Sequence, residues 1–232
     1  MINNKKILAI IPARKGSKRL PFKNILDLNG KPLIAWTFEE VAKSNLIDRI
    51  LVSTNDENII NLTKNYKVEA PFKRPVKLSG DKVSTYEVII HAIDFYKSKN
   101  ILFDYILLLQ PTSPLRKCVD IDNAIKLLNK NTYAVVSVCE TEHSPLWANS
   151  LPRNLSMKSF IKPEIKNKRS QDLPIYYRLN GAIYISEIEY FIKNNGFLGD
   201  KTKAYIMPQS RSIDIDTKID FELCKIMMNE NN

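Results

Sequence analysis

The stretch ILAIIPARKGSKRLPFKN, residues 7–24, is the most informative part of the sequence for the fold class, because an apolar run of strand length leads directly into a strongly basic loop. Residues 7–13 show no polar alternation, which is typical of a parallel strand that is buried on both faces. Residues 14–23 then carry five cations in ten positions. Because ligands of α/β sheets collect at the carboxyl ends of the strands, we expect a binding site here.

Outward from this stretch, strand-like and helix-like segments alternate along most of the chain. Ser84 and Glu87 have the spacing of a helix-capping box. The alternation predicts a doubly wound, mostly parallel α/β sheet. The further strands are expected over residues 49–54, 104–110, 133–139, 181–186 and 204–207, and the helices from Pro32 onward, over 57–66, 84–97, 119–129 and 216–229, with a short one after residue 186.

The alternation breaks between about residues 140 and 173, a polar, basic stretch punctuated by Pro145, Pro152 and Pro163 and followed directly by Pro174. A structureless connection of this length is unusual inside a compact domain. Its apolar groups are costly to leave in water, so burial against a second copy of the chain is expected. An arm folded back on its own subunit is the alternative. The apolar groups are Leu146, Trp147, Leu151, Leu155, Met157, Phe160 and Ile161.

Composition narrows the class of protein. The 232 residues contain no apolar run long enough to span a membrane, and residues 1–11 do not have the pattern of a signal peptide, so we expect a cytoplasmic protein. Three widely spaced cysteines indicate neither a disulfide framework nor a zinc site. A net charge of +10 permits binding of nucleic acid or of a polyanionic small molecule, but it also fits a general bias toward lysine.

The basic loop, defined here as residues 12–24, has the chemistry of a triphosphate cradle. Gly16 lets the backbone approach a ligand closely, and backbone N–H groups together with Arg and Lys heads bind phosphates. The loop contains neither a Walker motif nor a Gly-x-Gly-x-x-Gly motif. A merely solvated basic loop is the alternative.

A second motif, SIDIDT at residues 212–217, suggests a metal site. On a strand, Ile213 and Ile215 would face the core, and Asp214 and Asp216 would project together from the other face. Two adjacent carboxylates repel each other unless a divalent cation such as Mg²⁺ neutralises them. An exposed edge with Asp216 as a helix N-cap is the alternative. Phosphate binding combined with metal ligands fits nucleotidyl transfer.

Taken together, the motifs resemble those of the CMP-sialic acid synthetases (acylneuraminate cytidylyltransferases). The resemblance spans nearly the whole chain in order, and it includes Arg74-Pro75. The matching motifs are PAR at 12–14, GSK at 16–18, KN at 23–24, LQPTSPLR at 109–116, RLNGAIYI at 178–185 and SIDIDT at 212–217.

The resemblance implies a dimeric, Rossmann-like enzyme that uses Mg²⁺ to couple CTP to a nine-carbon 2-keto sugar acid, releasing pyrophosphate. It implies a nucleotidyltransferase domain formed by residues 1–143 and 171–232, with residues 144–170 as an inserted dimerisation arm. The anomeric 2-hydroxyl of the sugar would attack the α-phosphorus of CTP, with Asp214 or a metal-bound hydroxide as the base.

Site residues follow from the motif positions. The catalytic set would be Arg14, Lys18, Lys23, Asp214 and Asp216, the last two holding Mg²⁺. The CTP-binding set would be Ala13, Arg14, Ser17, Lys18, Lys23, Asn24, Arg74, Ser84 and Thr85. The sugar-binding set would be Gln110, Arg169, Asn180, Tyr184 and Phe197.

Two departures from the family pattern concern the sugar. Ser170 stands where the family often has arginine, with Arg169 one place earlier, and Leu198 stands where an aromatic pair often continues after Phe197. N-acetylneuraminic, legionaminic and pseudaminic acids therefore stay open as substrates. The alternatives are a cytidylyltransferase for the eight-carbon acid Kdo and a non-catalytic nucleic-acid-binding protein, although neither nucleic acid nor membrane is the expected partner.

Overall fold

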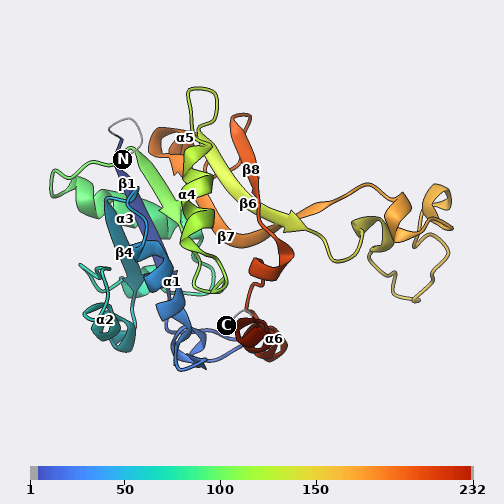
Figure 1. Cartoon of the computed structure of the whole chain (residues 1–232), viewed down its shortest axis with the longest axis horizontal. Helices are drawn as coiled ribbons and strands as arrows, with labels where there is room; N and C mark the ends of the chain where they lie inside the picture. Colours follow the sequence, from blue (N-terminus) through green and yellow to red (C-terminus); the bar gives the residue numbers. More distant parts are fainter. Residues whose placement is uncertain (1–4, 231–232) are drawn as a thin grey trace.

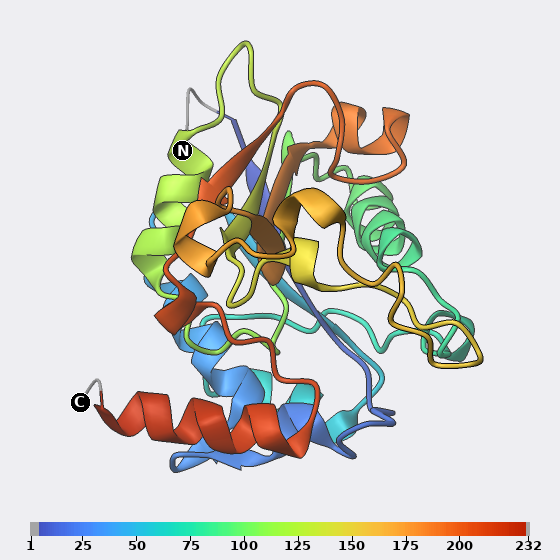
Figure 2. The same ribbon diagram turned by 90° about the vertical axis from the view of Figure 1, so that its right-hand side faces the viewer.

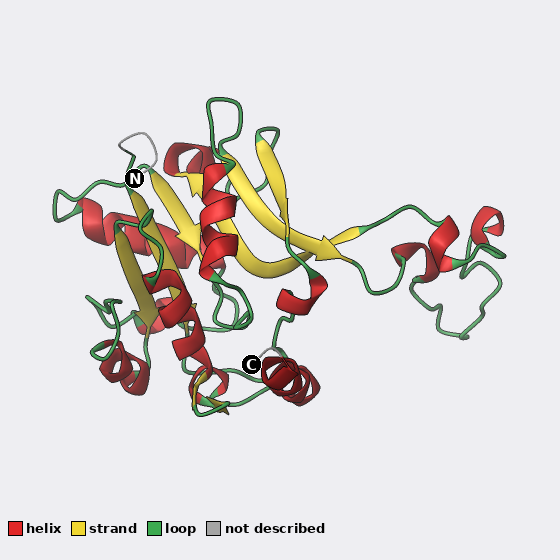
Figure 3. Ribbon diagram, viewed as in Figure 1, coloured by secondary structure: helices red, strands yellow, loops and turns green. Residues whose placement is uncertain are grey.

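The computed structural model describes residues 5–230, which form one six-stranded sheet flanked by helices, with a long arm on one side (Figures 1 and 3). The strand order is β4-β1-β5-β7-β6-β8. The strands are β1 (Ile7–Ala13), β4 (Arg49–Thr54), β5 (Tyr105–Leu108), β6 (Ala134–Glu140), β7 (Tyr177–Glu187) and β8 (Thr202–Ile206). A two-stranded ribbon is formed by β2 (Asp27–Leu28) and β3 (Lys31–Pro32).

Strand β1 organises the core because its alternate residues face two different helix layers. Ile7 and Ile11 lie in a cluster with side chains of α1 and α4, whereas Leu8 and Ile10 pack with those of α3 and α5. All seven residues of β1 except Pro12 are buried, as predicted for a central parallel strand. The helices are α1 (Leu33–Ala42), α2 (Glu57–Thr63), α3 (Thr85–Lys97), α4 (Cys118–Lys126), α5 (Ile188–Lys193) and α6 (Lys218–Glu230).

The predicted doubly wound, mostly parallel sheet is confirmed, with one correction. Strand β7 runs antiparallel to both of its neighbours, β5 and β6. It is antiparallel because the chain leaves β6, makes the arm excursion and returns directly beside β6. A bulge interrupts the β6–β7 pairing around Ser137, and Gly181 on the opposing strand has φ of +74°. Bulges of this kind re-aim side chains and often lie next to active sites.

Local signals set several boundaries correctly. The capping box is present at α3, where Glu87 N–H donates to Ser84 Oγ (3.2 Å) and Ser84 N–H donates to Glu87 Oε2 (2.8 Å). Helix α1 begins one residue later than expected, because Pro32 pairs in the small ribbon and serves as the N-cap. Helix α2 ends at Thr63 rather than at residue 66, and β5 is shorter than predicted.

Residues 212–217 do not form a sheet strand, which corrects the prediction made for the SIDIDT motif. The segment is extended, and Ile215 N–H donates to the carbonyl of Thr112 (2.8 Å). Ile215 is fully buried in a third apolar cluster with Leu28, Leu115 and Phe221 of α6. Ile215 anchors the segment between the two aspartates, and Ile213, which is partly buried, packs against the same cluster.

The arm, residues 144–170, projects away from the sheet in Figure 1, and in Figure 2 it lies in front of the sheet because that view looks along the arm. It contains short 3-10 turns, Pro145–Trp147 and Pro163–Ile165. Leu151, Leu155 and Met157 are exposed, whereas Leu146, Trp147, Phe160 and Ile161 are partly buried. The alternative of an arm folded back on its own subunit is not what the structure shows. Within residues 5–230, no helix has the length and apolar character needed to cross a membrane.

Candidate active site

A cavity of about 530 Å³ opens at the carboxyl ends of β1 and β5, where the α/β fold predicts a ligand site. The basic loop forms one wall, the residues before α3 form the opposite wall, and Gln110 and Thr112 form the floor. Ten of the predicted site residues line it: Arg14, Ser17, Lys18, Lys23, Asn24, Arg74, Ser84, Thr85, Gln110 and Asp216. Six do not: Ala13, Arg169, Asn180, Tyr184, Phe197 and Asp214.

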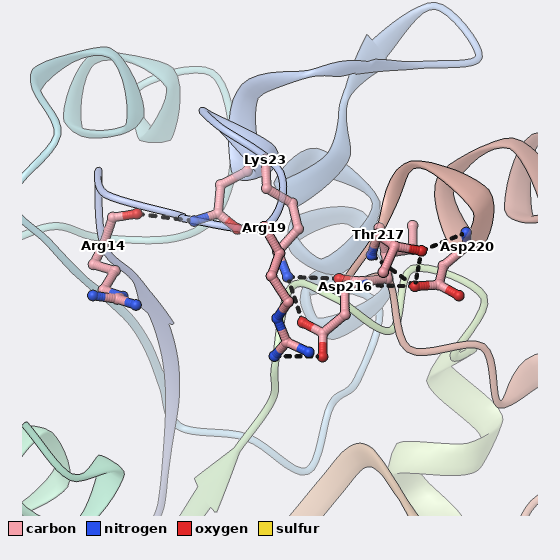
Figure 4. Close-up of polar contacts among 8 residues, drawn as sticks. Arg14, Arg19, Lys23, Asp216, Thr217 and Asp220 are labelled. Atoms are coloured by element: carbon pink, nitrogen blue, oxygen red, sulfur yellow. Dashed lines mark hydrogen bonds and ion pairs between the residues drawn. The ribbon is translucent and has the colours of Figure 1, made fainter. Parts of the chain in front are cut away.

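Lys23 is a buried cation that joins the two motifs. Its Nζ donates to the carbonyl of Ile215 (2.6 Å) and to Asp216 Oδ1 (3.1 Å), 193 positions away in sequence (Figure 4). The preceding Phe22 adopts a left-handed conformation (φ 54°), rare for a bulky residue. That sharp turn lets Phe22 remain exposed while Lys23 is directed inward.

Asp216 faces the cavity rather than capping α6. Thr217 is the capping residue, because Asp220 N–H donates to Thr217 Oγ1 (3.3 Å), and Asp220 Oδ2 accepts from Thr217 N–H (2.7 Å) and Asp216 N–H (3.0 Å) (Figure 4). The Asp216 carboxylate forms ion pairs with Arg19 (2.9 Å) and Lys23 (3.1 Å). The alternative reading of Asp216 as the N-cap is therefore wrong.

Asp214 lies behind the cavity wall in a more buried position. Burial raises the pKa of its carboxyl, repulsion from Asp216 adds to the rise, and the nearby Thr112 hydroxyl opposes it. Within the described residues, Asp214 Oδ1 and Thr112 Oγ1 are both buried without a geometrically acceptable hydrogen bond. A Cβ on Gly181 would lie 3.4 Å from Asp214 Oδ2, so this glycine keeps space beside the carboxylate.

The two aspartates fit a hard divalent cation only in part. Asp214 offers an unsatisfied oxygen, and Asp216 offers a carboxylate at the cavity surface. Among residues 5–230, no group of three or more His, Cys, Asp or Glu side chains could hold a metal by itself. A Mg²⁺ ion here would need further oxygens, and phosphates are its usual partners in such sites.

Asp81 is a residue of the cavity that the sequence analysis missed. Its carboxylate pairs with both Arg14 and Lys18, through different oxygens, and the Lys18 Nζ to Asp81 Oδ2 distance is 2.5 Å. Lysine and arginine together lower the pKa of Asp81. Because 67 positions separate Asp81 from Arg14, no local pattern could have linked them.

Arg74 lines the cavity with a largely buried side chain. It is almost completely buried, and its guanidinium donates to Ser53 Oγ (3.0 Å) and to the Ser53 carbonyl. Burial, with repulsion from Arg14, lowers the Arg74 pKa to about 10, so the side chain remains a cation at neutral pH. Asn24 supports the basic loop by donating to the carbonyl of Arg14 (3.3 Å). Ala13 is buried, which leaves only its backbone for a ligand.

The predicted sugar-binding residues are divided. Asn180 is fully buried, where it accepts from Ser137 Oγ (2.6 Å) and donates to Ser212 Oγ (2.9 Å), so it ties β6 to the segment that carries Asp214. Burial raises the pKa of Tyr184, and the negative charge of Asp214 adds to the rise. The Tyr184 ring packs on Phe197, with ring centroids 5.4 Å apart. Arg169 belongs to the arm, is exposed and does not line the cavity.

Comparisons with known proteins agree with this site. The family of cytidylyltransferases matches residues 8–227, and the chain belongs to that family of CTP-dependent nucleotidyltransferases. The chain is 38% identical to the CMP-N,N'-diacetyllegionaminic acid synthase of Legionella pneumophila, with 97% of each chain covered. It is 34% identical to the pseudaminic acid cytidylyltransferase of Campylobacter jejuni, with 98% of each covered. The resemblance predicted from the motifs is thereby confirmed.

Two further likenesses support narrower conclusions. The N-acylneuraminate cytidylyltransferase of Escherichia coli is 35% identical over 98% of this chain, which spans 53% of that protein. A solved CMP:2-keto-3-deoxy-manno-octonic acid synthetase complexed with CTP superposes with a TM-score of 0.72, covering 98% of this chain and 100% of that one. At 16% identity, that likeness shows the fold alone.

Proposed function

We propose that the protein transfers CMP from CTP to the anomeric 2-hydroxyl of a sialic-acid-type nonulosonic acid and releases pyrophosphate. The observation that carries the proposal is the meeting of Lys23 with Asp216 at a cavity lined by further cations. Cations that could bind phosphate therefore lie beside carboxylates that could bind a metal ion, and nucleotidyl transfer uses both kinds of group. The names of the relatives in Legionella and Campylobacter support a nine-carbon sugar acid as the acceptor.

The chain's own residues would act mainly by positioning and by offsetting charge. Arg14, Lys18 and Lys23 would bind the triphosphate and stabilise the negative charge that develops on the leaving pyrophosphate. Arg74 and the Ser84–Thr85 turn form the wall proposed to receive the nucleoside.

We propose Mg²⁺ as the cofactor, held by Asp214 and Asp216. When bound, such an ion supplies Lewis-acid stabilisation of phosphate charge and lowers the pKa of a coordinated hydroxyl. For Asp216 to serve as a ligand, its ion pairs with Arg19 and Lys23 must loosen, which frees both cations for phosphate. Metal binding and triphosphate binding would therefore support each other at this carboxylate.

We also propose a homodimer in which each arm completes the sugar site of the other subunit. Arm side chains such as Leu151, Leu155 and Met157 are 53%, 70% and 59% exposed, which is costly for a lone chain. Arg169 lies on the same arm and would bring a cation to the partner's sugar carboxylate. The cysteines of the described chain are free thiols, which suits the reducing cytoplasm that we propose as the location.

The test is a pyrophosphate-release assay that varies the nucleotide and the sugar separately. We expect activity with CTP and an excess of Mg²⁺, and much less with ATP, GTP or UTP. The acceptor panel contains N-acetylneuraminic, legionaminic and pseudaminic acids, with Kdo as the eight-carbon control. Turnover of Kdo alone would replace this proposal by the Kdo alternative, and absence of turnover with any acceptor would refute it.

A further inference from the structure

Four cations that line the cavity form ion pairs with two carboxylates of the same cavity. Arg19 and Lys23 pair with Asp216, and Arg14 and Lys18 pair with Asp81. Asp216 already has a proposed role as a metal ligand. Asp81 has none, although its carboxylate occupies two of the cations that would bind triphosphate.

Asp81 lies on a turn that reaches over the cavity. The turn connects the 3-10 helix Val76–Leu78 to α3, and it is closed by a hydrogen bond from Val83 N–H to the Gly80 carbonyl (3.3 Å). Gly80, Asp81 and Val83 all line the cavity. The side chain of Asp81 is 43% exposed, so it could turn toward solvent without leaving a buried charge unpaired.

A phosphate group cannot share these cations with Asp81 at no cost. A triphosphate that engages Arg14 and Lys18 would bring several negative charges close to the Asp81 carboxylate, and like charges at such a distance repel. Binding therefore requires Asp81 to release both cations. The site would exchange between a state in which Asp81 is paired with the two cations and a state in which they are released. The apparent affinity for an anion is then the affinity of the released state multiplied by the fraction of molecules in that state.

We propose that Asp81 is an internal competitor for the phosphate-binding cations, which holds them in place in the empty site and weakens the binding of pyrophosphate after transfer. The inference rests on the proposed function, because it takes Arg14 and Lys18 as triphosphate ligands. Asp81 touches the substrate-binding cations rather than the reacting atoms. It would therefore tune product release and nucleotide affinity together.

The expected size of the effect is modest. Exposed ion pairs contribute about 0–1 kcal/mol each, and Lys18 in particular is 79% exposed. A total near the middle of that range for the two pairs, about 0.7–1.4 kcal/mol, corresponds to a change in affinity of roughly threefold to tenfold. Because the competition is electrostatic, it should disappear at about 1 M salt, where the screening length falls to about 3 Å.

Calorimetric titration of the full chain with inorganic pyrophosphate and with CTP, without sugar, tests the proposal. Asp81→Asn should bind both ligands about threefold to tenfold more tightly at low salt, and the difference should vanish at high salt. Asp81→Glu, which keeps the charge, should resemble the wild type. Asp94→Asn is the matched control, because Asp94 is an exposed carboxylate on α3 outside the cavity lining.

In turnover, the inhibition constant of pyrophosphate should fall in Asp81→Asn by the same factor as its dissociation constant. Unchanged or weaker pyrophosphate binding in a folded Asp81→Asn would overturn the inference, because a merely structural clasp would lose affinity when broken. An active wild type with that result would leave the proposed function intact. A wild type that neither binds pyrophosphate nor releases it from CTP would remove both.

Discussion

Large apolar side chains are buried in the α/β body, whereas several of those in the arm are exposed. In the body, Ile183 and Ile185 of β7 are fully buried between two helix layers. In the arm, Leu155 and Met157 are 70% and 59% exposed, and the arm projects away from the sheet (Figure 1). The body therefore has a complete core of its own, whereas the arm has an apolar surface without one.

The body and the arm also differ in how far apart in the sequence the partners of their charged residues lie. In the body, Lys23 and Asp216 meet at the cavity, and their partners are set by elements far apart in the chain. In the arm, Arg169 is exposed, and its backbone N–H is satisfied locally by Asp172 (3.3 Å). Under the proposed function, the body carries the nucleotide site, and Arg169 of the arm does not line the cavity of its own chain. We therefore expect one subunit to be sufficient for CTP binding but not for sugar binding.

The largest effect is expected on turnover, from a substitution at the proposed metal site of the body. Asp216→Asn keeps the shape of the side chain but removes a charged ligand from the proposed metal site. We expect turnover to fall at least about a hundredfold while the chain stays folded and dimeric. Steady-state kinetics with varied Mg²⁺, together with circular dichroism, check this. Near-normal turnover in the variant would refute the metal assignment.

Lys23→Ala tests whether the cations of the basic loop serve the transition state. Removing this charge should cost roughly 2–4 kcal/mol in kcat/KM for CTP, which is about thirtyfold to a thousandfold. Lys64→Ala is the control, because Lys64 follows α2 and lies on the exposed surface. Equal effects of the two substitutions would mean that the basic loop is only a solvated surface.

Replacing residues 146–161 by a short Gly/Ser linker tests the arm as a whole. We expect a monomer by light scattering at micromolar concentration, with CTP affinity nearly retained and sugar KM raised about tenfold or more, since a hydrogen bond to a charged group contributes about 1.5–3 kcal/mol. A wild-type monomer with full activity would contradict the proposal for the arm.

A complementation experiment sharpens the same comparison. Arg169→Ala alone should raise the KM for sugar by about tenfold. Addition of excess Asp216→Asn chains, which have an intact Arg169 but an inactive site, should restore the activity of the Arg169→Ala chains severalfold through mixed dimers. If Arg169 serves its own chain, mixing will restore nothing.

The smallest expected effect concerns stability. Met157→Ser, on the exposed arm, should change the free energy of unfolding of the dissociated chain by less than about 0.5 kcal/mol, while weakening the dimer. Ile183→Ala, in the body, calibrates the measurement, because it should cost about 2–5 kcal/mol. Denaturant unfolding at nanomolar chain concentration measures the stability of the dissociated chain, and analytical ultracentrifugation at micromolar concentration measures dimer formation. An equal loss from both variants would show that the arm is part of the folding core.

Local signals in the sequence were sufficient for much of the body. The apolar run 7–13 predicted β1, and the Ser84–Glu87 spacing predicted the start of α3, because each depends on hydrogen bonds or periodicity within a few residues. Order along the chain also predicted the class of sheet. The motifs identified the family, since several matched in sequence over nearly the whole chain, and the comparison confirmed it.

Tertiary structure alone decided how these parts meet. The antiparallel direction of β7, the pairing of Asp81 with Arg14, and the enclosure of Asn180 all depend on contacts between residues tens of positions apart. Such contacts leave no periodic trace, because either partner would look like an ordinary surface or turn residue in its local sequence. The sequence by itself determined which groups were present for the chemistry. Packing of the chain determined which cations share a carboxylate, which side chains reach the cavity, and which apolar groups of the arm stay uncovered.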